Sequence, residues 1–512
     1  MSSRTGQHGM TEVDVTSARP IRQLFFCTWA ILSLLCCAWA IATPIAAVPD
    51  EPAHLIKAAS VVRGEFVGDV GPNGQQVSVP QWVAYTHVQA CFAFDGTVTA
   101  DCSPPVPGNP AETVTASTTA GLYNPTYYLL VGLPSLVFSD SAGVFAMRVV
   151  SGIATSLFLA AAVAMLAALP RRRLPLLGML AAVTPMVLFL GGSVNPNGME
   201  TAATLAAFIG VLSLVAHPDP RSVRALAIGV SLSAAVAVNM RGLSPLWVVI
   251  ALTAPLILAS RETLSILLRR TAIRWMIAII GIAGALALTW ILGSGSLVSG
   301  IGGTPTVERP EVPYTGASPL VGFYSVFQGT FELAQNMVGI FGWLDTPVPP
   351  GVFFVWSAFV GGLIVASFVV LRGRALLLCS LLVVGVVVVP ALVQAAYITG
   401  GGYIWQGRYT LPLFVCAIIA MAVLVDWSLP LTDDVWPLRL SLAVIVLWAV
   451  AQFFAFAMAI RRYSVGVLDS WVSMVLEPLW SPPGGVVLSL SAFAALIAAL
   501  SISLYRLIRI RS

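Results

Sequence analysis

Charged side chains are scarce in this sequence. Asp, Glu, Lys and Arg make up 9% of its 512 residues and hydrophobic residues 58%, whereas roughly a quarter of the residues in a soluble domain are charged. A soluble fold could not bury so much apolar surface, so we expect an integral membrane protein. Apolar runs of about 20 residues recur, the alternating pattern of a β-barrel is absent, and lipid offers backbone groups no partner. The sequence therefore predicts an all-α, polytopic membrane fold.

Motifs for soluble chemistry are also missing. The sequence contains no Walker loop, no zinc-type cluster of Cys and His, and no GxSxG elbow. The net charge is +4, but positive and negative residues are sorted into different loops. Such sorting is typical of a membrane protein and does not indicate a nucleic-acid-binding surface.

Twelve apolar segments have the length of a membrane span. We expect a membrane domain from residue 21 to residue 505, a disordered cytoplasmic tail over 1–20 and a basic cytoplasmic tail over 506–512. The predicted spans are 21–48, 142–169, 174–193, 198–216, 224–240, 242–259, 275–295, 351–371, 375–397, 409–426, 438–460 and 485–505. The first is too long for a signal-peptide core and is expected to be retained.

A thirteenth apolar run at 123–138 decides the topology. If this run crossed the membrane, every later loop would change sides. If it lies on the outer surface, the arginine-rich loops near 171–173, 261–274 and 372–374 all face the cytoplasm, as the positive-inside rule favours. The run is also short and contains Pro125 and Pro134, which is typical of an interfacial helix. We therefore expect 123–138 not to span and both termini to lie in the cytoplasm.

This topology leaves three sizeable outer regions, 49–141, 296–350 and 461–484. Most of the 22 Asp and Glu residues fall in them, and the inner loops are short. Any chemistry is therefore expected on the outer face. None of these regions is large enough to indicate a separate soluble domain, and no internal repeat of the transporter kind is evident.

Two of the seven cysteines stand apart from the rest. Five lie inside apolar spans and are expected to be core residues. Cys91 and Cys102 instead flank a polar turn, FAFDGTVTAD, in the largest outer region, where an oxidising compartment permits a disulfide. We predict that Cys91 and Cys102 are bonded; the alternative is two unpaired thiols.

The segment VPDEPAHLIKAASVVRGEF follows the first span and carries two adjacent carboxylates. Pro52 is suited to the first position of a helix, which makes Glu51 the expected cap. If the helix began slightly earlier, Asp50, His54 and Lys57 would share one helix face. A capped helix with a solvated charged end is one interpretation. A functional site is the other, because carboxylates at a membrane exit are costly to desolvate.

The segment GGGYIWQGRYTLPLF places Arg408 at the expected outer mouth of a span, among aromatic residues typical of an interfacial belt. Arg148 and Arg241 also lie at outer ends of spans. A guanidinium binds a phosphate in a bidentate fork and stays charged. Each arginine alone is explained by snorkelling to lipid headgroups, but as a set at one depth the three favour a phosphate site.

These features resemble the GT-C superfamily, membrane glycosyltransferases that use polyprenyl-phosphate sugars. The resemblance rests on the acidic pair after the first span, the aromatic YNPTYYLL segment, Arg148 at the head of the next span, and the alternating spans. The motifs PDEPAH, SVNPNGME, FGWLDTPVP and QGRYTLP are more closely similar to a large bacterial family of predicted membrane proteins, over about residues 20–505. One departure is Asn197, which stands where an acid is expected, although Glu200 follows.

The resemblance implies a site on the outer face. Asp50 or Glu51 would be the catalytic base, with Asp50 favoured because Glu51 is expected to cap the helix. Arg408, with Arg148 or Arg241, would bind the donor phosphate. Some members of the superfamily use a divalent cation such as Mg or Mn, but no unmistakable ligand set is present here. The residues expected around the sugar and the acceptor are His54, Lys57, Tyr123, Trp343, Asp345, Gln406 and Tyr409.

The sequence thus predicts an inverting glycosyltransferase in a bacterial plasma membrane. It would move a monosaccharide from a polyprenyl-phosphate donor to an envelope glycan or glycolipid on the extracytoplasmic face. One alternative is a transporter or flippase of a lipid-linked saccharide, which predicts ionisable groups in mid-span. The other is a non-catalytic envelope scaffold, in which both carboxylates would be dispensable.

Overall fold

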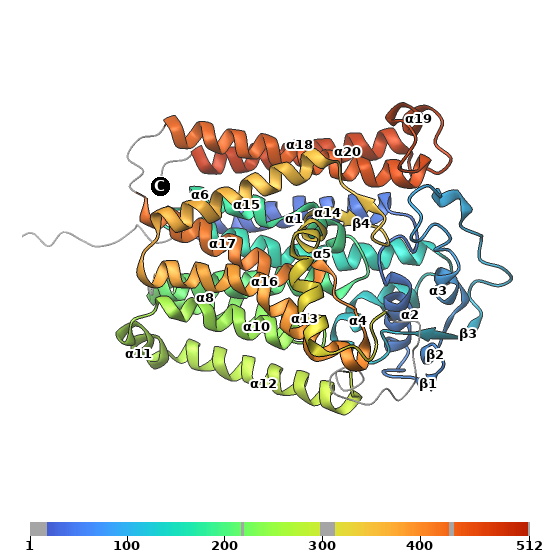
Figure 1. The fold of residues 1–512 in the computed structure, drawn as a ribbon, viewed down its shortest axis with the longest axis horizontal. Coiled ribbons are helices and arrows are strands. Elements are labelled where there is room, and N and C mark those ends of the chain that lie inside the picture. Colours follow the sequence, from blue (N-terminus) through green and yellow to red (C-terminus); the bar gives the residue numbers. More distant parts are fainter. Residues whose placement is uncertain (1–17, 217–219, 297–312, 430–434, 510–512) are drawn as a thin grey trace, which may run out of the picture.

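The computed structural model describes residues 18–216, 220–296, 313–429 and 435–509 of the chain. The long helices run side by side along the longest axis and form one bundle (Figure 1). A small sheet and several short helices cover one end of this bundle, which we call the sheet end. Most of the predicted cytoplasmic tail (1–17) and the last three residues of the basic tail lie outside the described residues.

Nine helices in the described ranges are long and apolar enough to cross a bilayer. Each satisfies its own backbone hydrogen bonds, as lipid requires of a spanning segment. They are α1 (Ala18–Ala42), α5 (Ala142–Ala167), α8 (Pro196–Ala216), α12 (Thr271–Ser294), α15 (Pro350–Val370), α16 (Gly373–Gly401), α17 (Leu411–Ser428), α18 (Val435–Val465) and α20 (Val486–Arg509).

The predicted span 174–193 is a broken helix. It consists of α6 (Arg173–Ala182) and α7 (Pro185–Gly191), which are bent by 65°. Pro185 accounts for the break, because a proline disfavours helical geometry in the residues before it; Val183 accordingly has a ψ of 77°. Thr184 caps α7 by accepting a hydrogen bond from the Val187 N–H at 3.3 Å.

Two more predicted spans correspond to shorter apolar helices. They are α9 (Pro220–Ala237) and α10 (Ser244–Thr253), the latter extended by the 3-10 helix η4 (Ala254–Leu258). All twelve predicted segments therefore fall on helices. By length and composition, however, the described chain has nine spans, or ten if α6 and α7 cross together. The predicted number of twelve is not confirmed.

The apolar run 123–138 forms two short helices, α4 (Pro125–Val131) and η3 (Leu133–Leu136). Asn124 caps α4 by accepting a hydrogen bond from the Thr126 N–H at 3.0 Å. A helix of seven residues rises only about 10 Å, against roughly 30 Å for the hydrocarbon core. This run is too short to span, as predicted.

The basic loops gather at the end of the bundle opposite the sheet, which we call the basic end. Arg171 donates to the Asp426 carbonyl at the last turns of α17, at 3.1 Å. Arg173 donates to the Ile508 carbonyl at the last turn of α20, at 3.3 Å. The helix α11 (Arg261–Arg269) lies at the same end (Figure 1). The sorting of charge seen in the sequence is thus a sorting between the two ends of the molecule.

The sheet end begins with α2 (Glu51–Val61), which packs against an antiparallel sheet in the order β1-β2-β3. The strands are β1 (Asp69–Gly71), β2 (Gly74–Pro80) and β3 (Thr113–Thr118), and Val77 pairs with Ala116. Val77 and Val79 are buried while Ser78 is exposed, the alternation expected of a half-buried strand. The short helices α3 (Gln81–Ala84), η1 (Tyr85–His87) and η2 (Ala100–Cys102) follow β2.

The predicted outer region 296–350 contains α13 (Pro319–Gln328), α14 (Thr330–Gly339) and a short hairpin. The hairpin strands are β4 (Ile340–Phe341) and β5 (Thr346–Pro347). The third region carries α19 (Trp471–Leu476). In Figure 1, β4 and α19 both lie toward the sheet end.

Arg462 joins the three predicted outer regions. Its buried guanidinium donates to the Phe92 and Asp95 carbonyls at 2.7 and 2.8 Å, and it forms an ion pair with Asp345 at 2.8 Å. The loop that it binds is closed by the disulfide Cys91–Cys102, so the disulfide prediction is confirmed. The three regions therefore form one continuous layer over the sheet end.

The topology can be tested with single cysteines at the exposed positions Glu112 and Pro170. Because 123–138 is too short to span, Glu112→Cys and Pro170→Cys should react with an impermeant maleimide from opposite sides of the membrane. Labelling would be compared in right-side-out and inverted vesicles. Reaction of both cysteines from the same side would mean that residues 123–138 cross the bilayer.

Candidate active site

Asp50 lies at the junction between α1 and α2, in a left-handed backbone conformation with φ 61°. Aspartate tolerates this conformation better than most residues. The helix begins at Glu51, not after it, so Asp50 occupies the N-cap position, and its side chain makes no capping hydrogen bond. The prediction that Glu51 caps the helix was wrong by one residue. Asp50 therefore keeps its carboxylate free of the backbone.

Glu51 instead forms a buried ion pair with Arg148, and both side chains have no exposed surface. The Arg148 Nε donates to Glu51 at 2.8 Å and Nη2 donates to the other carboxylate oxygen. The remaining N–H groups bind the carbonyls of Ala40, Thr43 and Pro44. All five guanidinium hydrogens are thus used. The prediction that Arg148 binds the donor phosphate is wrong, because it has no donor left.

Arg408 lies in η5 (Gly407–Tyr409) and forms an ion pair with Asp50 through Nη2. Its side chain is 3% exposed, whereas that of Asp50 is 46% exposed. The Arg408 Nε and Nη1 are buried and have no hydrogen-bond partner in the described part of the chain. A buried charged donor without a partner is costly. Nε and Nη1 are therefore donors to which the described residues offer no acceptor.

Arg241 lies beside Arg408. Both guanidinium groups lie over the Tyr409 ring, at 4.2 Å for Arg241 and 5.2 Å for Arg408. The Arg241 Nη1 is buried and, among the described residues, makes no hydrogen bond. Arg241 thus contributes a second cation, and its Nη1 lies 3.8 Å from the Glu200 carboxylate. Asp50, Arg241, Arg408 and Tyr409 form one cluster, which we call the arginine site.

The loop that carries Arg408 is held by Gln394, a buried residue of α16. Its amide nitrogen donates to the Gly402 carbonyl at 2.8 Å, and its amide oxygen accepts from the Ile404 and Trp405 N–H groups at 3.2 and 3.0 Å. Gly407 is needed where the loop turns, since a Cβ there would collide with the Leu333 carbonyl. These contacts fix the position of Arg408 relative to α16.

His54 lies one helical turn after Asp50 and is 5% exposed. Its Nδ1 and the Tyr128 hydroxyl are hydrogen-bonded at 2.8 Å. Its ring meets that of Tyr123 edge-on at 5.5 Å. Burial lowers the pKa of His54 to about 3, although Asp50 raises it slightly. At neutral pH this histidine is uncharged and serves as a polar wall of the arginine site.

Lys57 and Trp343, which were also predicted at the sugar site, form hydrogen bonds with backbone carbonyls. Lys57 is buried and donates to the carbonyls of Phe66 and Gly121, and burial lowers its pKa to about 8. Trp343 donates to the Ala46 carbonyl at 2.9 Å.

The Asp345 carboxylate forms an ion pair with Arg462. Gln406 is half-buried and lies two residues before Arg408, with a buried side-chain oxygen that has no partner in the described chain. The structure therefore brings three of the predicted sugar and acceptor residues to the arginine site: His54, Tyr123 and Tyr409. Gln406 lies next to this site in the loop. Lys57, Trp343 and Asp345 bind other parts of the chain.

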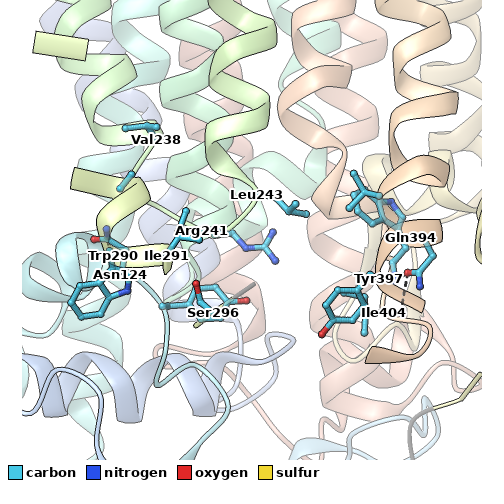
Figure 2. Close-up of a pocket in the computed structure, with 15 residues that line it drawn as sticks. Asn124, Val238, Arg241, Leu243, Trp290, Ile291, Ser296, Gln394, Tyr397 and Ile404 are labelled. Carbon is cyan, nitrogen blue, oxygen red and sulfur yellow. Dashed lines mark hydrogen bonds between the residues drawn. The ribbon is translucent and has the colours of Figure 1, made fainter. Parts of the chain in front are cut away.

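A cavity adjoins the arginine site between α12 and α16 (Figure 2). It holds about 150 Å³ of space accessible to water. Arg241 points into it, and Gln394 and Tyr397 stand on the facing wall. Much of the remaining lining is apolar and comes from Val238, Leu243, Ala287, Ile291, Val393 and Ile404. The cavity therefore combines a cationic end with apolar walls.

The residues of the arginine site do not fit a divalent cation. Two carboxylates face this site, and each lies against a guanidinium group: Asp50 against Arg408 and Glu200 against Arg241. In the described part of the chain, no three His, Cys, Asp or Glu side chains are grouped as metal ligands. Two neighbouring positive charges would repel Mg²⁺ or Mn²⁺. The positive charge at this site is supplied by the arginines.

Sequence reasoning missed Glu200 and Gln394. Glu200 was noted only as the acid that follows Asn197, yet it is fully buried and 3.8 Å from Arg241. Gln394 lies inside an apolar span. Polar and ionisable residues are costly within spans and usually pair with another group of the protein. The presence of Glu200 and Gln394 within spans could therefore have indicated their importance. Which partners they have depends on the packing of distant helices.

No curated protein sequence matches the chain. The chain is similar to the crystal structure of ArnT from Cupriavidus metallidurans bound to undecaprenyl phosphate, with 13% identity and a TM-score of 0.45 over 96% of this chain and 77% of that chain. It is also similar to the arabinofuranosyltransferase AftD from Mycobacteria, with 14% identity and a TM-score of 0.40 over 86% of this chain and 27% of that chain.

The family described as "Predicted membrane protein (DUF2142)" matches residues 32–417. That range contains most of the membrane bundle, together with Asp50, Arg241 and Arg408. The chain belongs to the DUF2142 family of predicted membrane proteins.

Proposed function

We propose that this protein is an inverting glycosyltransferase that takes a monosaccharide from a polyprenyl-phosphate donor. One observation carries the proposal: an accessible carboxylate, Asp50, is paired with a buried arginine, Arg408, whose Nε and Nη1 have no hydrogen-bond partner among the described residues. A base and a binding site for an oxyanion are thus adjacent. The acceptor would be an envelope glycan or glycolipid on the extracytoplasmic face of a bacterial plasma membrane.

The reaction requires few groups from the protein. The acceptor hydroxyl attacks C1 of the sugar, and its proton passes to an Asp50 carboxylate oxygen. The bond between C1 and the phosphate oxygen breaks, and its electron pair leaves with the polyprenyl phosphate. Arg408 and Arg241 stabilise the negative charge that develops there. No acid is needed to protonate the leaving group, which separates this chemistry from that of glycosidases.

Asp50 is suited to be the base, and Glu51 is not. The Asp50 side chain is half-exposed, whereas that of Glu51 is fully buried. Glu51 binds Arg148 with both oxygens and also accepts the Val194 N–H at 3.0 Å. An acceptor hydroxyl can therefore reach Asp50 alone of the two. A donor phosphate that binds Arg408 would compete with Asp50 for the guanidinium and free the carboxylate.

The apolar walls of the cavity beside Arg241 suit the part of the donor's lipid chain that adjoins the phosphate. Its apolar walls come from α12 and α16, helices that expose most of their apolar surface along the bundle. Packing of apolar side chains around a polyprenyl chain is favourable in proportion to the apolar area removed from water. A lipid chain seated between α12 and α16 would place its phosphate near Arg241.

The alternative function is transport of a lipid-linked saccharide. Ion-coupled transport needs ionisable groups along the path through the membrane. In the described ranges, buried charged side chains are concentrated at the sheet end, as Glu51, Arg148, Glu200 and Arg408, while Asp426 lies alone at the basic end. This distribution favours chemistry at one face over passage through the bundle.

Arg408→Ala should weaken binding of undecaprenyl phosphate. A hydrogen bond to a charged group contributes roughly 1.5–3 kcal/mol, so we expect the dissociation constant to rise about 10- to 150-fold. Arg461→Ala is the matched control, because Arg461 binds the Val467 and Asp469 carbonyls at the same end. If Arg408→Ala bound undecaprenyl phosphate with the same affinity as the wild type, Arg408 would contact only the headgroups of membrane lipids.

Asp50→Asn should lose most transfer, on the order of 100-fold or more for removal of a general base, while undecaprenyl phosphate still binds. Transfer would be measured with a panel of polyprenyl-phosphate monosaccharides. Asp69→Asn, at an exposed position of the sheet end, is the control and should have normal activity. Normal turnover by Asp50→Asn would refute the proposed reaction and favour a scaffold.

Glu51→Gln should act on stability. Removing one partner of a buried ion pair costs about 3–5 kcal/mol, because the other charge is left uncompensated. We therefore expect a lower melting temperature in detergent, and activity that falls in proportion to the folded fraction. A folded Glu51→Gln protein with a normal melting temperature and no turnover would instead identify Glu51 as the base.

A further inference from the structure

Glu200 is a buried carboxylate in α8 that the proposed reaction does not use. Its carboxylate oxygen Oε2 lies 3.8 Å from Arg241 Nη1, and that oxygen accepts no hydrogen bond in the described chain. The other oxygen accepts from the Ser244 hydroxyl, and Ser244 in turn accepts from the Arg241 backbone N–H at 2.9 Å. Glu200 is thus directed at a cation of the arginine site.

This contact gives the arginine site two carboxylates for its two guanidinium groups. Arg241 and Arg408 contribute two positive charges, and Asp50 and Glu200 contribute two negative charges. His54 adds none at neutral pH, because burial lowers its pKa to about 3. Two arginines alone would hold any lipid phosphate firmly. The second carboxylate reduces that attraction, since its charge acts on the phosphate through the same low-dielectric surroundings.

The proposed transfer changes the charge of the lipid. The donor is a phosphodiester with one negative charge, and the product is a phosphate monoester, which carries about 1.5 to 2 negative charges near pH 7. A purely cationic site would therefore bind the product more tightly than the donor. Repulsion from a fixed carboxylate scales with the ligand's charge, so it acts more strongly on the product.

We propose that Glu200 determines specificity for the phosphodiester donor over the monoester product. It does so by repelling the additional charge that transfer creates, so that the lipid phosphate leaves the site. This inference rests on the proposed function. The Ser244 hydroxyl group is hydrogen-bonded to both the Glu200 carboxylate and the backbone N–H of Arg241.

The test compares two lipids that need no knowledge of the sugar: undecaprenyl phosphate and its methyl ester, at pH 7.5. Glu200→Gln keeps the volume and the hydrogen bond to Ser244 but removes the charge. It should tighten binding of the methyl ester by about threefold and that of the monoester by about tenfold, because the second factor is roughly the square of the first for twice the charge.

Two controls separate charge from packing. Ser244→Ala removes the hydrogen bonds and leaves the charge, so the ratio of the two affinities should not change. Asp426→Asn removes a buried carboxylate at the basic end and should alter neither affinity. A Glu200→Gln protein that tightens both lipids equally, weakens both, or changes neither would overturn the inference.

The wild type provides a measurement that does not depend on folding of a variant. Its affinity for undecaprenyl phosphate should be no tighter than its affinity for the methyl ester, although the monoester has more charge. Monoester binding more than tenfold tighter would overturn the inference. If Arg408→Ala affects neither lipid, the proposed function itself fails; if it weakens both and Glu200→Gln has no effect, the inference alone fails.

Discussion

The ion pair between Glu51 and Arg148 ties together four segments of the chain. Arg148 in α5 binds three carbonyls at the end of α1, and Glu51 at the start of α2 accepts the Val194 N–H before α8. Two charges are fully removed from water here, which is tolerated only when nearly every donor and acceptor is used. The position of α2 over the bundle depends on this pair.

The same pair explains why two adjacent carboxylates have different roles. Glu51 points into the bundle and is fully buried, while the left-handed conformation of Asp50 accompanies a carboxylate that remains half-exposed beside Arg408. The arginine site is thus held from both sides. Glu51 and Arg148 fix Asp50, and Gln394 fixes the loop of Arg408. Asp50, Arg408, Arg241 and Glu200 therefore lie together in one cluster of charged side chains.

Much of this architecture could be predicted from the sequence, because hydropathy and the distribution of arginines depend on local composition. The short run at 123–138 and the disulfide Cys91–Cys102 are examples. The number of spans could not, since a hydropathy pattern registers neither the break at Pro185 nor the short lengths of α9 and α10. Nor could the pairing of charges: Asp50 and Arg408 are 358 positions apart. The sequence could not show that Arg148 binds Glu51, because these residues are 97 positions apart and only helix packing brings them together. Arg148 was therefore assigned to the donor phosphate.

The central claim is that Arg408 and Arg241 bind the phosphate of a polyprenyl lipid beside Asp50. A cryo-EM map of the full chain with undecaprenyl phosphate in a lipid nanodisc tests it most directly. We predict phosphate density in contact with the Arg408 Nε or Nη1 and the Arg241 Nη1, with the lipid chain between α12 and α16. Phosphate density elsewhere in the protein, with the Asp50–Arg408 pair intact, would contradict the account.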